Sequence, residues 1–542
     1  DFETAPEIRE ALRRRVEHGV FGYNVVTRDW YEAYQGWWGR RHHLEMEQDW
    51  LVFCTGVVPA ISSAVRKLTT VGENVLVQTP VYNIFFNSIR NNGRNILESP
   101  LVYDGGEYSI DFGNLEEKLA DPQTTLMLLC NPHNPVGKIW DRETLARIGE
   151  LCARHHVLVL SDEIHCDLTD PGYEYVPFAA VSDVCRDNSV TCLAPTKAFN
   201  LAGLQTAAVM VPDPVIRHKL ERGLNTDEVA EPNSFAVGAA VAAFREGEPW
   251  LEELLQVVDG NARYVASFLA EHIPQARCYP LEGTYLLWVD FGGLGLHHKE
   301  LERLMLSAKL FLDEGAMFGK EGRGFERFNL ALPRSAVESA MARLLKAWQD
   351  LQADWAANGR PERLTLEAGM KMPDFTYDTP FTSGLRFVEE CGGRPVVLLF
   401  HRYYGCSVCN AAMDRLAADY DAVTAAGGQV KVVLQSAPER VREAMGGENR
   451  FPFDVVCDPE RTLYERFSVF PADTMFDLAG DDLQALLPMA AGMFFGSGRE
   501  DAPHEGLQDQ LPAWFAVDGD GVARCAHYGE SIFDVPDAAA MA

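Results

Sequence analysis

The fold is constrained most by a series of short apolar runs in the N-terminal part of the chain, separated by segments with helical amphipathic spacing. A run of four or five apolar residues has the length of a strand, and a strand without polar alternation is buried on both faces. Such strands alternating with helices are typical of a mainly parallel sheet. We therefore predict an α/β domain whose sheet contains residues 74–78, 125–129, 157–160, 189–193 and 207–211.

A second, smaller α+β lobe is predicted after this sheet. Its helices and strands are expected at 235–273, 283–291, 298–308, 325–332 and 335–348. A polar stretch with Gly and Pro then interrupts the helical spacing, which is typical of a linker. We expect a first domain at 1–351, with a large part at about 45–230 and the small lobe formed by 1–44 and 231–351, and a linker at 352–368.

The remaining residues, 369–542, have the strand, CxxC, helix, strand order of a thioredoxin-like domain. The predicted hairpin turns at Asp518-Gly-Asp-Gly, a strong turn signal. A segment rich in Gly, Met and Asp matches neither half, so we interpret it as an insertion. The predicted strands are 395–400, 429–435, 514–517 and 522–527, the helix is 411–426, and the insertion is 471–510.

Composition excludes several classes of partner. The 48 basic and 79 acidic residues give a net charge of −31, which repels nucleic acid and anionic lipid. We therefore expect no nucleic-acid partner. We also expect no membrane partner, because the longest apolar runs fall far short of the about 20 residues that cross a bilayer. Most of the twelve cysteines are isolated in apolar runs, which indicates a reducing compartment, and we expect a cytoplasmic protein.

Two apolar runs are followed by residues suited to chemistry. The run ending at Leu160 delivers Ser161, Asp162 and Glu163 to the carboxyl end of a strand, where ligands bind in open α/β sheets. The next run precedes Lys197, which lies among small and apolar residues. A lysine becomes a nucleophile when desolvation or charge lowers its pKa. Taken singly, the acid is more often a helix cap and the lysine a solvated surface residue.

Two turns extend this pattern. The segment 131–137, Asn-Pro-His-Asn-Pro-Val-Gly, follows one predicted strand, and Thr55-Gly56-Val57 opens a helix, where a glycine turn provides a phosphate site. Taken alone, they are a plain turn and a helix cap. Together, the motifs resemble those of the fold-type I pyridoxal-phosphate enzymes, and among these the cystathionine β-lyase-like C–S lyases, over residues 1 to about 351. The resemblance is carried by residues 21–23, 79–82, 131–137, 161–165 and 196–204.

The resemblance implies that pyridoxal 5′-phosphate is the cofactor. Lys197 would bind it covalently, and Asp162 would pair with the pyridinium nitrogen, which makes the ring an electron sink. Tyr82 would stack on the ring face, and Asn134 would hydrogen-bond the phenolic oxygen of the ring. His165 lies nearby, where the related aminotransferases have tyrosine.

Further residues would hold the phosphate and the substrate. Gly56 and Val57 would offer backbone N–H groups to the phosphate, with Thr196 beside them. Tyr23 would reach the phosphate of a neighbouring subunit, which implies a homodimer with shared active sites. Arg327 matches the arginine that binds the substrate α-carboxylate as a bidentate pair, with Asn134 close to the substrate.

Two positions depart from the family pattern. Ala194 replaces a serine that often contacts the phosphate, and Gln205 replaces an arginine found in many aminotransferases. Phosphate binding must then depend more on Thr196, on backbone groups and on the partner subunit.

The implied reaction is β-elimination from an S-substituted L-cysteine or cystathionine. Lys197 would remove the Cα proton as general base, with Tyr82 at the same catalytic centre. A thiol, pyruvate and ammonia would be the products. Transamination is the alternative outcome, in which case the chain is an aminotransferase.

A pair of cysteines forms a second constellation. Cys406 and Cys409 lie between a predicted strand and a predicted helix, where the helix dipole lowers a thiol pKa. No second CxxC and no histidine pair at ligand spacing occurs in this part of the sequence, so we expect no metal. The pair is interpreted as a reactive dithiol, and two buried structural cysteines are the alternative.

The region from Ala368 to about Asp537 resembles the peroxiredoxin-like members of the thioredoxin superfamily. In peroxiredoxins the peroxidatic cysteine follows a proline and a threonine, and with Cys409 in that role these positions fall on Arg402 and Cys406. The peroxidase pattern is therefore broken, and a dithiol–disulfide couple is implied instead. Pro512 matches the cis-proline position of the superfamily. Resemblance to thioredoxins favours Cys406 as the attacking thiol, and alignment with peroxiredoxins favours Cys409.

The combination suggests the hypothesis that the second domain oxidises, reduces or accepts the sulfur that the lyase releases. A non-catalytic interaction or dimerisation module is the alternative. We interpret the aromatic run at 30–38 as core and dimer packing. His42 and His43, beside two arginines, are interpreted as a solvated face rather than a metal site.

Overall fold

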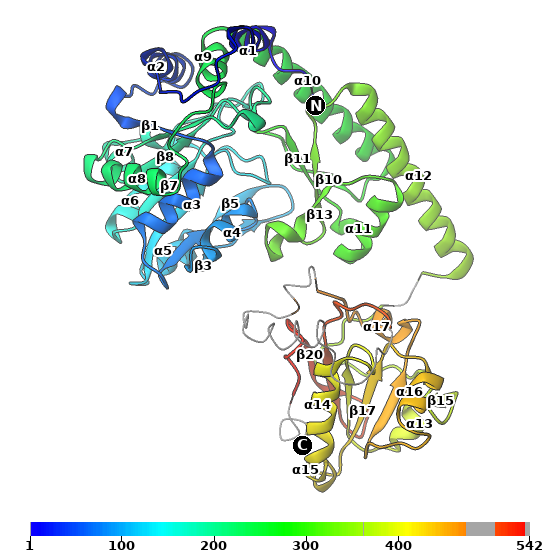
Figure 1. Ribbon diagram of the computed structural model, residues 1–542. Coiled ribbons are helices and arrows are strands. Elements are labelled where there is room, and N and C mark those ends of the chain that lie inside the picture. The colour runs from blue at the N-terminus through cyan, green and yellow to red at the C-terminus, as the bar shows by residue number, and fades with distance from the viewer. Residues whose placement is uncertain (1, 361–362, 473–477, 479–504, 537–542) are drawn as a thin grey trace. The chain divides into compact units, whose positions relative to one another are not determined.

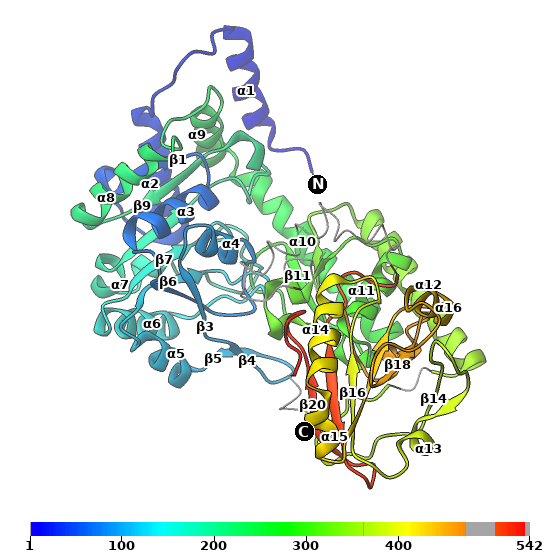
Figure 2. The same ribbon diagram turned by 60° about the horizontal axis from the view of Figure 1, so that its bottom comes forward.

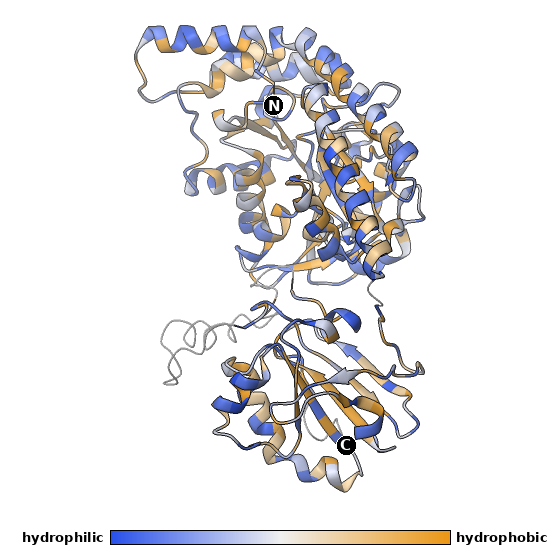
Figure 3. Cartoon of the chain, turned by 90° about the vertical axis from the view of Figure 1, so that its right-hand side faces the viewer, coloured by the Kyte–Doolittle hydropathy of each residue, from blue (hydrophilic) through white to orange (hydrophobic). Residues whose placement is uncertain are grey.

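The computed structural model describes residues 2–360, 363–472, 478 and 505–536. The chain forms two compact units, Asp1–Leu351 and Gln352–Ala542. Figures 1 and 2 show the helices and strands of each unit, and Figure 3 shows that the central strands of both are predominantly hydrophobic. Within the described ranges, no helix combines the length and the apolar character needed to cross a membrane.

The N-terminal unit is built on a seven-stranded sheet of order β1-β9-β8-β7-β6-β2-β3. All five predicted runs are strands of this sheet, and only β9 runs antiparallel to its neighbours. The predicted α/β class is therefore confirmed. The bounds are β1 Leu51–Cys54, β2 Asn74–Val77, β3 Asn95–Glu98, β6 Thr124–Cys130, β7 Leu158–Asp162, β8 Ser189–Leu193 and β9 Ala207–Met210.

Helices cover both faces of this sheet because alternate residues of each strand point to opposite faces. Val75 and Val77 pack into a core with α3, α4 and α8, whereas Leu76 packs into a second core with α5, α6 and α7. Burial on both faces explains why the strands lack polar alternation. The helices are α3 Val57–Leu68, α4 Ile84–Arg90, α5 Phe112–Leu119, α6 Arg142–Arg154, α7 Asp183–Asp187 and α8 Pro214–Thr226.

The smaller lobe contains a four-stranded antiparallel sheet of order β10-β11-β13-β12. Its long helix α12 continues to Asn358, seven residues into the segment predicted as a linker, and Gly359 follows with φ of 82°. The elements are β10 Arg277–Cys278, β11 Leu286–Asp290, β12 Asp313–Glu314, β13 Phe325–Asn329, α10 Glu248–His272, α11 His298–Ser307 and α12 Arg334–Asn358.

The N-terminal helices α1 (Pro6–His18) and α2 (Arg28–His42) pack on α9 (Ala236–Glu246). The aromatic run on α2 is part of the core, as predicted. Tyr34, Trp37 and Trp38 are buried and surround the ring of Phe244 at centroid distances of 4.7–5.3 Å.

The C-terminal unit is a five-stranded sheet of order β18-β17-β16-β19-β20. Strands β16, β17 and β18 are parallel, and β19 and β20 form the predicted antiparallel hairpin. The predicted thioredoxin-like order is confirmed, although the helix after the CxxC begins four residues earlier than predicted. Most of the predicted insertion, 471–510, lies outside the described residues. The bounds are β16 Val396–Phe400, α14 Ser407–Ala418, α15 Tyr420–Ala425, β17 Gln429–Leu434, β18 Asp454–Cys457, β19 Ala513–Val517 and β20 Ala523–Tyr528.

Candidate active site

The site of the N-terminal unit begins where the parallel strands end. Asp162 is the last residue of β7, and the strand register pairs it with Cys130 of β6 and Cys192 of β8. The carboxyl group is thus placed at the middle of the sheet edge where ligands bind in this class of fold. Asp162 is buried and accepts a hydrogen bond of 3.1 Å from the backbone N–H of Ile164.

Burial raises the pKa of Asp162 to about 6, although the Ile164 hydrogen bond and the charge of Lys197 act in the opposite direction. A carboxyl group in this state is stabilised as the anion by any further cation. A protonated pyridine nitrogen is a cation of suitable size, so the residue fits the predicted role beside a pyridoxal ring.

Lys197 lies in the turn after β8 and is half-buried. The turn is closed by backbone hydrogen bonds from Phe199 to Pro195 and from Leu201 to Thr196, at 3.0 and 2.9 Å. Burial lowers the pKa of Lys197, and the charge of Arg327 lowers it further, while Asp162 opposes both. An amine with a lowered pKa is a better nucleophile and base at neutral pH.

His165 is buried, and its ring meets Tyr285 edge-on at 5.9 Å. Burial, followed by the charges of Lys197 and Arg327, holds the pKa of His165 well below its ordinary value, so the ring is neutral. Its Nδ1 atom has no hydrogen-bond partner among the described residues. A buried ring nitrogen without a partner is costly, and a polar ligand at this place would satisfy it.

Arg327 joins the two lobes at the site. Its Nη1 donates a hydrogen bond of 2.6 Å to Oδ1 of Asn134, and its Nη2 forms an ion pair with Asp313. The guanidinium lies 4.6 Å from the ring centroid of Phe318. Its buried Nε has no hydrogen-bond partner within the described ranges. The arrangement places a fixed cation beside Asn134.

The turn that carries Asn134 is held by the small lobe. Gly137 has φ of 80°, and a Cβ atom there would lie 3.1 Å from the carbonyl oxygen of Gly283. The backbone N–H of Gly283 donates to the carbonyl of Gly137 at 2.9 Å. His133 contacts the carbonyl oxygen of Pro80 at 2.8 Å, which fixes this turn against the segment that contains Tyr82.

Tyr82 is half-buried, and its ring meets Phe85 edge-on at 5.8 Å. Burial and the charge of Asp162 raise the pKa of Tyr82, while Arg327 lowers it. Its phenol therefore lies within the electrostatic reach of both groups. The backbone N–H of Val81 donates to the carbonyl of Phe318 at 2.8 Å, so the small lobe also holds this segment.

The remaining predicted residues are those expected to bind the cofactor phosphate. Gly56 caps the twelve-residue helix α3, of which Val57 is the first residue, and Thr196 is buried beside Lys197. Tyr23 is fully exposed and lies in the segment between α1 and α2. Within one chain it therefore makes no buried contact with the site.

Sequence reasoning missed three residues of the site: Tyr285, Asp313 and Phe318. Each comes from the small lobe. Tyr285 reaches His165 through the packing of that lobe on the large sheet, whereas Asp313 and Phe318 reach Arg327 within the lobe itself. None belongs to one of the recognised motifs.

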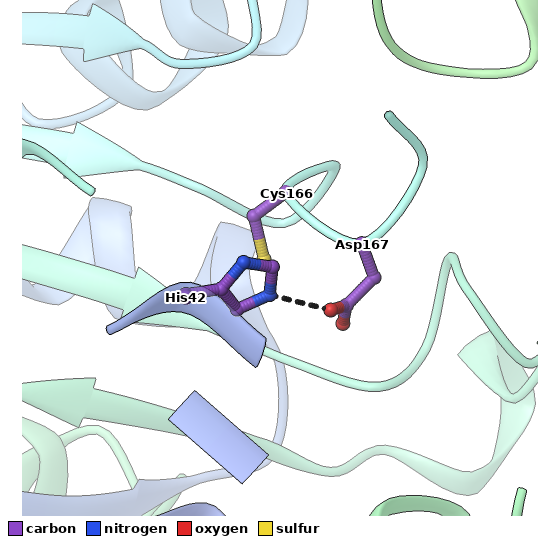
Figure 4. Close-up of side chains that lie close together, drawn as sticks. All are labelled: His42, Cys166 and Asp167. Atoms are coloured by element: carbon purple, nitrogen blue, oxygen red, sulfur yellow. Dashed lines mark hydrogen bonds and ion pairs between the residues drawn. The ribbon is translucent and has the colours of Figure 1, made fainter. Parts of the chain in front are cut away.

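A buried polar network supports the segment that follows His165. His42 of α2 contacts Oδ1 of Asp167 at 2.7 Å (Figure 4), and Trp37 donates to the same oxygen at 2.8 Å. Arg41 lies 3.7 Å from that oxygen. The ligand-type atoms of His42, Cys166 and Asp167 lie within 4.8 Å of one another. His42 is buried, so the prediction of a solvated face is wrong for His42, while His43 is exposed.

The dithiol of the C-terminal unit has an asymmetric environment. Cys406 is the N-cap of α14, and its sulfur accepts a hydrogen bond of 3.3 Å from the backbone N–H of Cys409. The hydrogen bond from the Cys409 thiol, assisted by the charge of Arg402, lowers the pKa of Cys406 to about 7 despite its burial. Burial holds the pKa of Cys409 well above its ordinary value.

Pro512 is not in the predicted conformation. The cis peptide bonds among the described residues are Thr79–Pro80, Asn131–Pro132 and Asn134–Pro135. Leu511 nevertheless packs against the cluster that contains both thiols, so this segment does lie beside the dithiol.

Comparison with known proteins identifies both units. Residues 1–344 match the family model of the class I and II aminotransferases. The chain belongs to the aminotransferase class I and II family. Residues 368–521 match the AhpC/TSA family, which confirms the predicted peroxiredoxin-like domain.

Two curated relatives of this family member are bacterial proteins. Cystathionine beta-lyase PatB of Bacillus subtilis (strain 168) is 42% identical over 348 residues, which cover 64% of this chain and 90% of that protein. Protein MalY of Escherichia coli (strain K12) is 33% identical over 350 residues, covering 64% and 89%.

Solved structures agree with these relatives. Cystalysin from Treponema denticola, which contains pyridoxal 5′-phosphate, matches with a TM-score of 0.64 and 36% identity over 65% of this chain and 89% of that one. The pyridoxal-phosphate-bound C–S lyase from Staphylococcus hominis matches with a TM-score of 0.60 and 29% identity, covering 64% and 89%. The predicted fold, cofactor and enzyme class are confirmed: the chain groups with the pyridoxal-phosphate-dependent C–S lyases of the cystathionine β-lyase type.

Proposed function

We propose that residues 1–351 catalyse β-elimination from an S-substituted L-cysteine or from cystathionine, giving a thiol, pyruvate and ammonia. The observation that carries this proposal is the convergence of Asp162 and Arg327 on Lys197 at the carboxyl edge of the sheet. A buried acid, an amine of lowered pKa and a fixed cation are the groups that this reaction requires.

The donor set fits the family cofactor, pyridoxal 5′-phosphate. Asp162 has a buried carboxyl group that a ring cation would stabilise, and His165 has a buried ring nitrogen without a partner. When bound, the cofactor supplies an electron sink for the pair left at the substrate Cα. Lys197 would hold the cofactor and, once released, would take the Cα proton at Nζ.

The remaining residues would bind and orient the substrate and the cofactor ring. Arg327 would hold the substrate α-carboxylate, and Asn134, which accepts from Arg327, would fix that guanidinium and contact both the cofactor and the substrate. Tyr82 would cover one face of the ring.

Phosphate binding would fall to the N-terminus of α3 and to a second subunit. The backbone N–H groups of Gly56 and Val57 lie at the positive end of that helix, and Thr196 lies next to Lys197. Ala194 and Gln205 offer neither a hydroxyl nor a guanidinium. The full exposure of Tyr23 supports a role across the interface of a homodimer.

A panel of cysteine S-conjugates assayed for pyruvate tests this function, with Lys197→Ala as the blank. Release of pyruvate without an added keto acid supports elimination. Product formation only with a keto acid would instead identify an aminotransferase.

For the C-terminal unit we propose dithiol–disulfide chemistry that acts on the released sulfur, with Cys406 as the attacking thiol. The support is the contrast between the lowered pKa of Cys406 and the raised pKa of Cys409. The Cys406→Ser/Cys409→Ser variant should leave pyruvate release unchanged and alter the redox state of the released thiol. An unchanged redox state, together with an unreactive dithiol in thiol titration, would identify an interaction module.

A further inference from the structure

Arg402 is a buried cation with unused hydrogen-bonding capacity beside the dithiol. Its side chain is 3% exposed, and its Nη1 lies 3.9 Å from the sulfur of Cys406. Its Nε and Nη2 atoms are buried and have no hydrogen-bond partner within the described ranges. In the same part of the chain, no acidic side chain forms an ion pair with it.

Such an arrangement is costly unless a ligand completes it. A buried guanidinium normally pairs with a carboxylate or donates most of its five N–H groups. Stabilising the thiolate of Cys406 uses one of these groups and leaves a fork of donors free. A planar fork of this kind matches an anionic group with two acceptor positions.

The surroundings indicate the chemical character of that ligand. The sulfurs of Cys406 and Cys409 belong to an apolar cluster with Tyr403, Leu478 and Ile532. The guanidinium of Arg402 also lies 5.2 Å from the ring centroid of Tyr403. These neighbours match a molecule with one anionic end and an otherwise apolar body.

We propose that Arg402 and Cys406 form a subsite for a small sulfur electrophile whose anionic group binds the free N–H groups of Arg402 while its sulfur meets the thiolate. This inference rests on the proposed redox function of the C-terminal unit. It further specifies that the substrate of that unit carries an anionic group.

The reaction balances without a further reactant. The thiolate of Cys406 attacks the sulfur of R–S–S–R′, the S–S bond breaks, and R′–S⁻ leaves. The Cys409 thiol then loses its proton and attacks the sulfur of Cys406. The mixed disulfide breaks, R–S⁻ leaves with that proton, and a Cys406–Cys409 disulfide remains. The substrate disulfide gains two electrons and the protein dithiol loses two.

Two disulfide probes of opposite character test the subsite on the full-length holoenzyme. One is 5,5′-dithiobis(2-nitrobenzoate), which carries carboxylates, and the other is neutral 4,4′-dithiodipyridine. Single-turnover rates are measured with each, and the rate of the Cys406→Ser variant is subtracted. For Arg402→Met, the ratio of the anionic to the neutral rate should fall about tenfold or more, as expected for loss of a charged hydrogen bond. Any change in thiolate population cancels in this ratio.

Arg450→Met is the matched control, because Arg450 is exposed and lies over the rings of Tyr404 and Phe451 in the same unit. Its ratio should equal that of the wild type. If Arg402→Met is insoluble, Arg402→Gln removes the charge while keeping a donor, and the same fall is expected. An unchanged ratio in a folded Arg402 variant overturns the subsite. Absence of any Cys406-dependent reaction with either probe overturns the redox function itself.

Discussion

Nη1 of Arg327 donates a 2.6 Å hydrogen bond to Oδ1 of Asn134, so a strand of the small lobe and a turn of the large sheet share one polar contact. The same guanidinium pairs with Asp313, which lies next to it in the register of β12 and β13. Arg327 is therefore held from two sides before any substrate binds. A bidentate carboxylate site requires such a fixed fork.

Replacing Arg327 with lysine should separate charge from geometry. The ammonium keeps the charge but loses the fork, so we expect KM for a cysteine S-conjugate to rise about tenfold or more while kcat changes less. Steady-state pyruvate release measures both constants. Arg323→Lys, at an exposed position in the turn just before β13, should leave both unchanged. A lower kcat with an unchanged KM would contradict the assignment of Arg327 to carboxylate binding.

Asp162 should destabilise the cofactor-free protein. Its pKa in the folded state, about 6, lies above the ordinary value of 3.8, so the folded state binds the proton more tightly than the unfolded state does. The favourable contribution of the protonated form is lost as the pH rises through about 6. Two pKa units correspond to about 3 kcal/mol.

Asp162→Asn should therefore raise the unfolding midpoint of the cofactor-free N-terminal unit at pH 8, and the difference should shrink toward pH 4. Differential scanning calorimetry measures it. Pyridoxal phosphate should stabilise the wild type more than the variant, and β-elimination should fall on the order of 100-fold or more. A variant that is less stable at pH 8 without cofactor would show that the carboxylate is already paired.

Cys406 should be the thiol that reacts near neutral pH. Its pKa of about 7 makes the thiolate fraction rise between pH 6 and 8, whereas burial raises the pKa of Cys391 in the same unit to about 11. Alkylation by iodoacetamide, followed by peptide mass spectrometry, should show a step near pH 7 at Cys406 only. The step should disappear in Cys406→Ser. If instead an alkylation step near pH 7 remains in Cys406→Ser and is lost in Cys409→Ser, the attacking thiol is Cys409.

Buried strands were predictable because their apolar runs record burial on both sides of the sheet, as β6 and β8 show. Helix ends were less predictable from the sequence. Residues 352–358 combine helix-compatible residues such as Gln352, Ala353 and Trp355 with a polar character that suggested a linker. The helix stops only where Gly359 adopts a positive φ.

Partners that depend on tertiary packing were not predictable from local pattern. His42 looked like part of a solvated face because the carboxylate that holds it, Asp167, lies 125 residues further along the chain. Asp313 likewise meets Arg327 only through the pairing of β12 with β13. The motif residues Asp162 and Lys197 were found because strand ends and the turns after them are local features of the chain.

Asp167→Asn should weaken the N-terminal unit through the loss of one buried charge. The carboxylate accepts from Trp37 and His42 and lies 3.7 Å from Arg41, and it is 1% exposed. The substitution removes the charged acceptor of the hydrogen bonds from Trp37 and His42, whereas Arg41 keeps its ion pairs with Glu248 and Glu252. Losing hydrogen bonds to a buried charged group costs about 2 kcal/mol. The unfolding midpoint in urea should fall accordingly.

Asp183→Asn is the matched control for this prediction. Asp183 also pairs with an arginine, Arg186, but its side chain is 85% exposed, so its loss should change stability by less than about 0.5 kcal/mol. Equal shifts in the two variants would show that the network of Asp167 contributes no more than a surface pair. A large shift for Asp167 alone establishes it as the link between α2 and the segment that carries His165.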